Sequence, residues 1–574
     1  MSLGRLIAKG SKRPVFHITT PIFYPNAKPH LGHLYSSLLC DTTRRWYELL
    51  GYDTLFTTGT DEHGLKIQLA SEKNKFSSPK DFVDVLYREF TKLDQQANIK
   101  YSRFIRTTDP DHIENVKKLW TLCWEKNFIY KGTHNGWYSV SDETFYPDSK
   151  IVQVTKDGHE ISINNPNIDK LGKFINTETR NEVIFQSETN YFFKLSHFRD
   201  QLVKLIEQDD PNFIFPPSRA RQILRELKGS PLTDLSVSRP SSRIKWGIDV
   251  PQDPTQKIYV WFDALCNYIT SIGGIDAILS DSTAMVRHGS VTSIHQPAQW
   301  WQNTTHVIGK DIIKFHTIYW PSFLLAAGLP LPKQVVVHSH WLSGGVKMSK
   351  SLGNVVDPEE MIQYYGSDTM RWFLLENSQL DIDGDFNEKR LHATREQLVS
   401  KWGNLINRCC AKKFDLHRAV DTFAGKTTYA EIATELLNEQ QRDLFVKLME
   451  QSNDLVEVFH EKFTKFHTNG ALKVAWNLLN DTNQFVQISE PWSKSESTQD
   501  FVIFTAIEVS RILSILCQPV IPELSNSFLN RIDISLNRRT IDYAKFGFDH
   551  EYGGDANKRG RDVPLKRIPY RISV

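Results

Sequence analysis

The hydrophobic pattern near the N-terminus predicts a strand, a helix and a second strand. Residues 15–20 are rich in β-branched side chains, and a loop with proline and asparagine follows over residues 21–29. A helical pattern then extends from about Leu31 to Leu50, and a second strand is expected at residues 54–58. This order is typical of a βαβ unit, so we expect an α/β domain with a parallel sheet. Its ligands should bind at the carboxyl ends of the strands.

The pattern changes twice further along the chain. From about residue 120 to residue 243, short aromatic strands, turns and asparagine-rich stretches predict an inserted domain. Strand signals return at residues 258–262 and 306–309, and helical periodicity dominates from about residue 390 through residue 525. We therefore expect the α/β domain and its insert to be followed by an α-helical bundle.

Composition narrows the class of protein. The chain has 574 residues, of which 40% are hydrophobic and 24% charged, as is typical of a globular enzyme with several domains. No apolar run approaches the roughly 18 residues that span a bilayer, which argues against a membrane protein. The six cysteines form no Cys-x-x-Cys pair, which argues against a disulfide framework and a cysteine zinc site and favours a reducing compartment.

Positive charge is concentrated at the two ends, although Lys+Arg (69) and Asp+Glu (67) nearly balance overall. No acidic residue precedes Asp41, and the apolar, basic leader indicates an organelle transit segment over residues 1–13; an untargeted basic tail is the alternative. The C-terminal tail either contacts phosphates or is a solvated run of charge. The basic residues are Arg5, Lys9, Lys12 and Arg13 in the leader, and Lys558, Arg559, Arg561, Lys566, Arg567 and Arg571 in the tail.

Two short motifs suit the binding of a polyphosphate. His30-Leu31-Gly32-His33 follows a strand and opens a helix, where imidazoles can hydrogen-bond an anion that the helix amides and dipole already attract. Gly32 would let a flat ring approach the backbone. Far downstream, the lysines of residues 347–351 follow Gly344-Gly345, as in a mobile clamp. Each motif alone would be weak evidence, since surface histidines and solvated lysine loops are common.

Together, these motifs give the chain a specific resemblance. It resembles the class I aminoacyl-tRNA synthetases, and nearly all of it after Pro14 is similar to the methionyl-tRNA synthetases of the yeast mitochondrial type. Besides the two motifs, the matching stretches are TPIFYPN at 20–26, TGTDEHG at 58–64, YVWFDA at 259–264, IGKDI at 308–312 and FH at 315–316.

The resemblance implies a reaction. L-Methionine and ATP would give methionyl-adenylate and pyrophosphate, and the methionine would then pass to the 3′ end of tRNA(Met), initiator and elongator, for mitochondrial translation. The implied catalytic residues, which stabilise charge at the α-phosphorus, are His30, His33, Lys347 and Lys350. In the implied ATP site, Gly309 and Asp311 hold the ribose and residues 338–341 border adenine. The full set is Gly32, Gly309, Asp311, His338, His340, Trp341, Met348, Ser349 and Ser351.

The implied methionine pocket agrees with the chemistry of the side chain. A thioether offers soft apolar surface and only a weak acceptor, so aromatic packing, together with one or two hydrogen-bond donors, should recognise it. The resemblance assigns the α-ammonium to Asp61. Without the resemblance, Trp261 and Tyr268 would be interpreted as core aromatics. The pocket residues are Ile22, Tyr24, Trp261, Ala264, Leu265, Tyr268 and His316.

An anticodon site is implied in the helical half. Asn404 and Arg408 lie one turn apart on one helix face. With Trp492 they match the family's anticodon readers, since an indole can stack on a splayed base while an amide and a guanidinium bind base edges. From the residues alone, the alternative interpretations are a helix-capping role for Asn404, a solvated side chain for Arg408 and a core side chain for Trp492.

The remaining implications concern domains, metals and partners. Serine stands in residues 137–143 where zinc-binding relatives have cysteine, and His134, His159 and His197 do not make a ligand set, so we expect no structural zinc. Mg²⁺ should arrive with ATP. We expect a monomer of the mitochondrial matrix with no membrane contact. The expected divisions are a Rossmann-type catalytic domain (14–120 and 246–330), an inserted connective domain (121–245), a lysine-loop and stem-contact region (331–388) and the anticodon domain (389–574).

Three alternatives fit the residues less well. A branched-chain-specific class I synthetase needs a larger editing insert, and a cysteine-specific one needs zinc ligands. A small-molecule nucleotidyltransferase shares the His-x-Gly-His motif but does not need a helical half. An inactive RNA-binding relative would not need His30, His33 and both lysines.

Overall fold

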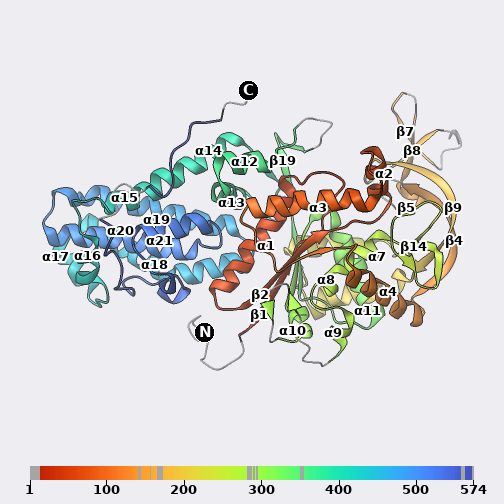
Figure 1. The fold of residues 1–574 in the computed structure, drawn as a ribbon, viewed down its shortest axis with the longest axis horizontal. Coiled ribbons are helices and arrows are strands. Elements are labelled where there is room, and N and C mark those ends of the chain that lie inside the picture. The colour runs from red at the N-terminus through yellow and green to blue at the C-terminus, as the bar shows by residue number, and fades with distance from the viewer. Residues whose placement is uncertain are drawn as a thin grey trace.

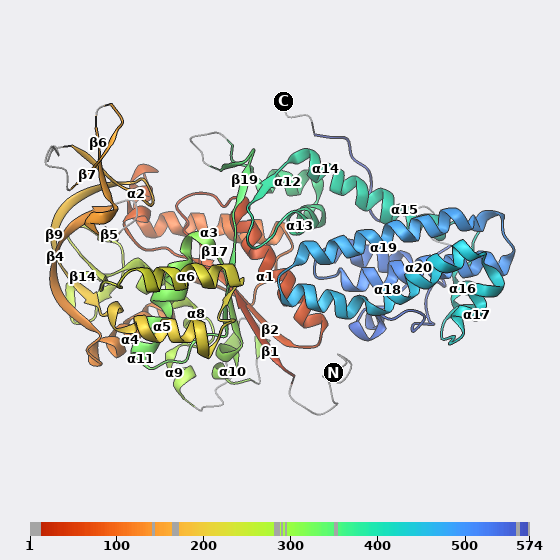
Figure 2. The same cartoon turned by 180° about the vertical axis from the view of Figure 1, so that it is seen from behind.

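The computed structural model describes residues 13–139, 144–155, 157–163, 172–280, 287–288, 291–292, 295–348, 354–557 and 563–571. An α/β half ends in a strongly curved antiparallel sheet, and a helical half forms the opposite end of the elongated molecule (Figure 1). Helix α1 (Leu31–Leu49) lies where the two halves meet, in this view and from behind (Figures 1 and 2). The expected transit segment falls almost wholly outside the described residues.

Six parallel strands form the central sheet, in the order β10-β18-β17-β1-β2-β3. Strand β1, helix α1 and strand β2 are the predicted βαβ unit, so the expected α/β fold is confirmed. Side chains alternate between two cores: Val336 joins the core on the α1 side, while Val335 and Val337 join the other. The strands are β1 (Val15–Thr19), β2 (Asp53–Thr60), β3 (Arg103–Arg106), β10 (Ile214–Phe215), β17 (Thr304–Gly309) and β18 (Gln334–His338).

Helices cover both faces of this sheet, as a buried parallel sheet requires. In the α/β half they are α2 (Leu65–Lys73), α3 (Pro79–Gln96), α4 (Pro110–Glu125), α5 (Arg199–Lys204), α6 (Pro217–Gly229), α7 (Val260–Leu265), α8 (Asn267–Thr270), α9 (Ile275–Leu279), α10 (Pro297–Gln302), α11 (Trp320–Ala327), α12 (Pro358–Tyr365) and α13 (Ser367–Glu376).

The predicted insert is largely an antiparallel sheet, in the order β5-β4-β9-β8-β6-β7 with β11 on β9. Strand β10 lies inside the expected range 121–245 yet pairs with β18 of the central sheet. Strand β10 has two residues, too few for periodicity to reveal its partner. The insert strands are β4 (Ile129–Ser139), β5 (Thr144–Tyr146), β6 (Ile151–Val154), β7 (Glu160–Ser162), β8 (Lys173–Asn176), β9 (Glu182–Phe193) and β11 (Leu235–Ser236).

The prediction of a strand at residues 258–262 is correct only for Ile258 and wrong for the residues after it. Strand β14 (Asp253–Ile258) ends there, and helix α7 begins at Val260. Every residue of α7 except Trp261 is buried, and such a short apolar run fits a buried strand as well as a buried helix. Smaller sheets are β12 (Ser238–Pro240) and β13 (Asp249–Val250) on β14, β15 (Arg287–His288) with β16 (Val291–Thr292), and β20 (Val346–Lys347), β19 (Trp341–Ser343) and β21 (Gly384–Phe386).

The predicted helical half is confirmed. Helix α20 (Glu496–Leu516) forms its centre, with every residue from Asp500 to Leu516 buried. The other helices are α14 (Glu388–Gln397), α15 (Asn404–Cys409), α16 (Leu416–Phe423), α17 (Tyr429–Leu436), α18 (Glu439–Thr464), α19 (Thr468–Ser489) and α21 (Pro522–Arg531). Within the described chain, no helix combines the length and the apolar character needed to cross a membrane.

Part of the basic C-terminal tail lies against α12 and α14 instead of projecting into solvent. Arg571 pairs with Glu388 at 2.9 Å and with Glu360 at 3.1 Å. The Tyr364 hydroxyl donates to the carbonyl of Pro569 at 3.0 Å. Of the two sequence-based alternatives, the solvated run therefore does not describe Arg571.

The two halves meet at a buried ion pair on α1. The Arg371 guanidinium donates to Asp41 Oδ2 at 2.8 Å and to the carbonyls of Pro519 and Val520 between α20 and α21. Burial would raise the pKa of Asp41, but Arg371, Arg45 and Arg44 hold it below its ordinary value. At the end of α1, Trp46 stacks on Phe463 of α18 with centroids 4.8 Å apart.

Replacing Arg371 tests this anchor. R371A would leave the Asp41 carboxylate buried without its main cation, so we expect the free energy of unfolding to fall by about 3–5 kcal/mol in urea titrations. The exposed Arg390→Ala should change it by less than about 0.5 kcal/mol. Equal effects from the two variants would contradict the anchoring role.

Candidate active site

The His-x-Gly-His motif forms the N-terminus of α1 at the carboxyl end of β1. His30 is the N-cap, and its Nδ1 accepts from the amide of Gly32 at 3.0 Å. His33 Nδ1 accepts from the amide of His30 at 3.0 Å, which completes a capping box made of two imidazoles. A Cβ at position 32 would lie 2.9 Å from the His30 ring, so glycine is what allows the ring to fold over the backbone.

These hydrogen bonds orient the rings. Their centroids lie 3.9 Å apart, and Phe23 and Phe90 contact the ring of His33 edge-on. Partial burial and the neighbouring His30 hold the pKa of His33 well below its ordinary value, so it is neutral at pH 7. A neutral imidazole that accepts at Nδ1 bears its proton on Nε2, and both rings therefore present an N–H donor.

The carboxyl ends of β17 and β18 carry the predicted ribose and adenine residues. Asp311 Oδ1 lies 3.0 Å from His340 Nε2, and a Cβ on Gly309 would lie 2.7 Å from the same oxygen. His338 is buried, with Nε2 2.8 Å from Ser36 Oγ, and burial lowers its pKa to about 4. Trp341 is buried as well, so of the predicted adenine border only His340 extends its side chain toward Asp311.

The predicted methionine residues meet in one aromatic cluster. Trp261 of α7 stacks on Phe315 with centroids 3.7 Å apart. The Tyr268 hydroxyl lies 2.6 Å from His316 Nε2, while His316 Nδ1 lies 2.9 Å from the carbonyl of Ile312. This arrangement makes Nδ1 the donor to Ile312 and Nε2 the acceptor from Tyr268. Ala264 and Leu265, on the same short helix, are buried beside them.

The predicted ammonium anchor, Asp61, lies on the loop after β2, which is hydrogen-bonded to the segment after β1. Phe23 accepts the amide of Asp61 at 2.8 Å and donates its own amide to Gly59 at 2.8 Å, which joins this loop to the segment that bears Ile22 and Tyr24. The Tyr24 hydroxyl donates to the carbonyl of His63 at 2.8 Å. The buried carboxylate of Asp61 thus lies on a loop tied directly to the predicted pocket residues.

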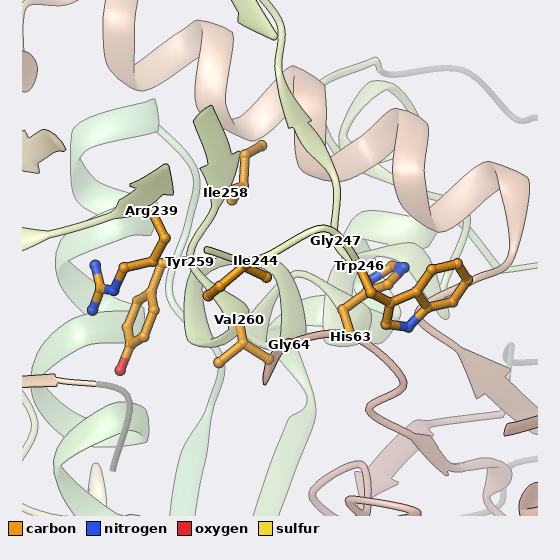
Figure 3. A pocket seen from close by; sticks show the side chains of 9 residues that line it. All are labelled: His63, Gly64, Arg239, Ile244, Trp246, Gly247, Ile258, Tyr259 and Val260. Carbon is orange, nitrogen blue, oxygen red and sulfur yellow. The ribbon is translucent and has the colours of Figure 1, made fainter. Parts of the chain in front are cut away.

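A small hollow of about 10 Å³ adjoins these residues on the insert side. Figure 3 shows His63 beside Trp246 at one end, with Arg239 and Tyr259 at the other. The Arg239 guanidinium lies 4.8 Å from the Tyr259 ring centroid. A second hollow of about 210 Å³ shares Arg239 and Ile244 with the first and opens between the insert and the α/β half.

The lysine motif is only partly described. Ser349, Lys350 and Ser351 lie outside the described residues, as does the side chain of Lys347. Its base is a hairpin in which β20 pairs with β19, and Gly344 and Gly345 have φ of 62° and 74° at the turn. Met348 is half-buried against the core on the α1 side.

Sequence reasoning missed Phe315, His63 and Asp263 as site residues. Phe315 and His63 lie within matching stretches, but their contacts appear only in the folded chain. Phe315 stacks on Trp261, and His63 lies within hydrogen-bonding distance of the Asp263 carboxylate. All six cysteines are buried and free, and no three His, Cys, Asp or Glu side chains gather as metal ligands in the part of the chain that the structure describes.

Comparison with known proteins gives the family of the chain. The model of the family described as tRNA synthetases class I (M) matches residues 16–410. The chain is 58% identical to the mitochondrial methionine--tRNA ligase of Saccharomyces cerevisiae, over 97% of this chain and 96% of the relative. It is 37% identical to the human mitochondrial methionine--tRNA ligase, over 92% of this chain and 85% of the relative. The chain belongs to the methionyl-tRNA synthetases of class I. The sequence-based resemblance is thereby confirmed.

A solved structure extends the likeness to the fold. The methionyl-tRNA synthetase of Mycobacterium tuberculosis bound by methionyl-adenylate has a TM-score of 0.79 and 32% identity, covering 93% of this chain and 96% of that one. Family membership makes this synthetase an enzyme that joins methionine to tRNA and uses ATP to do so.

The predicted anticodon residues of the synthetase all lie on two short elements of its helical half. Asn404 and Arg408 are exposed on α15, and Trp492 is 41% exposed in the short 3₁₀ helix after α19. Lys413, which follows α15, lies 5.7 Å from the Trp492 ring centroid. That contact joins the ends of the two elements that bear the three residues. None of the three is a core side chain.

The pH dependence of methionine binding tests the buried Tyr268–His316 pair. Burial lowers the pKa of His316 to about 4, so the ring stays neutral through the physiological range. We expect the KM for methionine in ATP–pyrophosphate exchange to be constant from about pH 8 to about pH 5.5.

Protonation of His316 would favour the unfolded chain, because the folded pKa lies below the ordinary value of 6.5. The stability that this histidine contributes is therefore complete above about pH 6.5 and is lost as the pH falls toward about 4. A break in the KM profile near pH 6.5 that Tyr268→Phe removes would contradict the neutral pair.

Proposed function

We propose that the cluster at the carboxyl edge of the central sheet is where this synthetase forms methionyl-adenylate. The observation that supports this most strongly is the double imidazole cap of α1. Two imidazoles with fixed tautomers stand at a helix N-terminus, and Phe23, which contacts His33 edge-on, is hydrogen-bonded to the loop of Asp61. Methionine and ATP bound at these neighbouring features would have the carboxylate and the α-phosphorus within reach of each other.

The proposed chemistry is an in-line displacement. The methionine carboxylate attacks the α-phosphorus, the new carbon–oxygen–phosphorus linkage forms and pyrophosphate leaves. His30 and His33 would donate from Nε2 to phosphate oxygens, and Lys347 and Lys350 would close on the leaving pyrophosphate from the hairpin. These groups stabilise developing charge and form no covalent intermediate. Mg²⁺ would be held mainly by the ATP phosphates.

Recognition of methionine would come from burial and not from hydrogen bonding of its side chain. The Tyr268 proton is already donated to His316, so a polar substrate side chain would lose its hydrogen bonds to water without a ready donor. A thioether loses little there and gains contact with Trp261. Asp61 would hold the α-ammonium, which every amino acid shares, and the aromatic wall would set identity.

We further propose that α15 and the 3₁₀ helix of Trp492 read the anticodon of tRNA(Met), initiator and elongator alike. Exposure of the indole and its contact with Lys413 support this, because an accessible ring beside a cation suits a stacked base and its phosphate. The mitochondrial names of the relatives, together with the acid-free leader, support action in the mitochondrial matrix, and we propose that the enzyme acts there as a monomer. The domain divisions expected from the sequence remain part of this proposal.

Removal of one imidazole tests the adenylation site. His33→Ala should reduce methionine-dependent ATP–pyrophosphate exchange by about 10²–10³-fold, since one preorganised donor is lost, while tRNA affinity stays within about twofold. The exposed His417→Ala of α16 is the matched control and should change neither quantity. An equal loss of exchange and tRNA affinity in H33A would mean that the site is misassigned.

Removal of the exposed indole tests the anticodon site. Trp492→Ala should weaken tRNA(Met) binding by about 5–100-fold, the range expected for one lost stacking contact, with exchange in the absence of tRNA unchanged. Trp124, 37% exposed on α4 of the other half, provides a matched Trp→Ala control. A W492A defect in the tRNA-independent step would remove the case for anticodon recognition.

A further inference from the structure

A buried carboxylate joins two histidines beneath the methionine pocket. Asp263 of α7 is 1% exposed; its Oδ2 lies 2.7 Å from His63 Nδ1 and its Oδ1 lies 2.7 Å from His112 Nε2. His112 belongs to α4, and its Nδ1 lies 3.3 Å from Thr270 Oγ1. Each carboxylate oxygen is therefore held by a different element, and the side chain cannot rotate without breaking a contact.

The two histidines act as donors to one carboxylate. Burial would raise the pKa of Asp263, but His63 and His112 hold it below its ordinary value, so the group remains ionised. Charge-assisted hydrogen bonds of this kind are about twice as strong as neutral ones. Burying a carboxylate with two histidines costs desolvation energy, and an apolar residue of similar size could fill the same space without that cost. Packing alone therefore does not explain this group.

The His63 side of this junction leads to the amino-acid anchor. His63 follows Asp61 by two residues on the loop after β2, and its carbonyl accepts the Tyr24 hydroxyl at 2.8 Å. Trp246 donates from Nε1 to the carbonyl of Glu62 at 2.6 Å on the same loop, and Figure 3 shows its ring beside His63. The loop is thus held at the carbonyls of Glu62 and His63, while the His63 ring contacts Asp263 and Trp246.

The Asp263 side leads to the aromatic wall. Trp261 and Ala264 flank Asp263 on the single short helix α7, and Trp261 is stacked on Phe315. A helix of six residues is marginal without tertiary contacts, so its side chains hold their positions only if the helix itself is anchored. The contacts of Asp263 with His63 and His112 provide that anchor.

We propose that Asp263, through His63, is a positioning residue that sets the spacing between the ammonium anchor Asp61 and the aromatic wall at Trp261. It touches neither ATP nor methionine in this arrangement. Its loss should therefore raise the KM for methionine selectively, because the two ends of one substrate would no longer meet their partners together. The inference rests on the methionine-site assignment proposed above.

The first test compares substrates. In ATP–pyrophosphate exchange, Asp263→Asn should raise the KM for methionine by about 10–100-fold while the KM for ATP stays within about twofold. The side-chain oxygen of asparagine can accept a hydrogen bond from one histidine. Its NH₂ group then faces the N–H of the other histidine and cannot accept from it. Active-site titration gives the folded fraction, so a stability loss cannot imitate the KM split.

The second test keeps Asp263 and changes its donor. In His63→Asn the amide nitrogen takes about the place of Nδ1 and can still donate, so the methionine KM should stay within about threefold; His63→Leu should raise it by about tenfold or more. His295→Leu is the matched control. That histidine lies equally buried, 2.7 Å from Asp53, at the opposite end of β2.

The possible results distinguish a failure of the positioning role of Asp263 from a failure of the methionine-site assignment. Selective methionine KM effects in D263N and H63L, with H63N and H295L near wild type, support it. Equal rises in both KM values, or H63L behaving like H63N, overturn it and leave Asp263 a structural residue. Asp61→Asn tests the site itself: no rise in methionine KM would overturn the site assignment and this inference together.

Discussion

The position of helix α1 is the constraint on which both the chemistry and the joining of the two halves depend. Its first turn is built from His30 and His33, its middle is fixed by the buried Asp41–Arg371 pair, and its last turn stacks Trp46 on α18. An ion pair in water would contribute little here, but a buried one is costly to break. One rigid helix therefore connects the proposed phosphate-binding end of the site with the half that bears the anticodon candidates.

In the proposed site, two kinds of interaction bind the two substrates. The phosphate side uses donors whose tautomers the backbone has fixed, so they need no reorganisation as charge develops. The methionine side uses stacked rings and a Tyr268 hydroxyl that already donates to His316. It therefore favours a substrate side chain that needs no hydrogen-bond donor. Burial keeps His33, His316 and His338 neutral, which suits both purposes.

The sequence was most informative where a local pattern sufficed. The βαβ unit, the helical half and the histidine cap follow from periodicity, turn residues and the order of elements. Two features depended on tertiary contacts: the helix α7 in place of a strand at 258–262, and the short β10 that joins the central sheet across the insert. Both are apolar segments whose partners lie far away in the chain. Phe315 and Asp263 were missed for the same reason, since a stacked ring and a shared carboxylate exist only after folding.

The central claim is that this one pocket accepts methionine through burial and aromatic contact. ATP–pyrophosphate exchange with each of the twenty amino acids, in the absence of tRNA, tests it most directly. The account predicts exchange with methionine alone. Equal exchange with a polar amino acid such as glutamine, or no exchange with any amino acid, would contradict it.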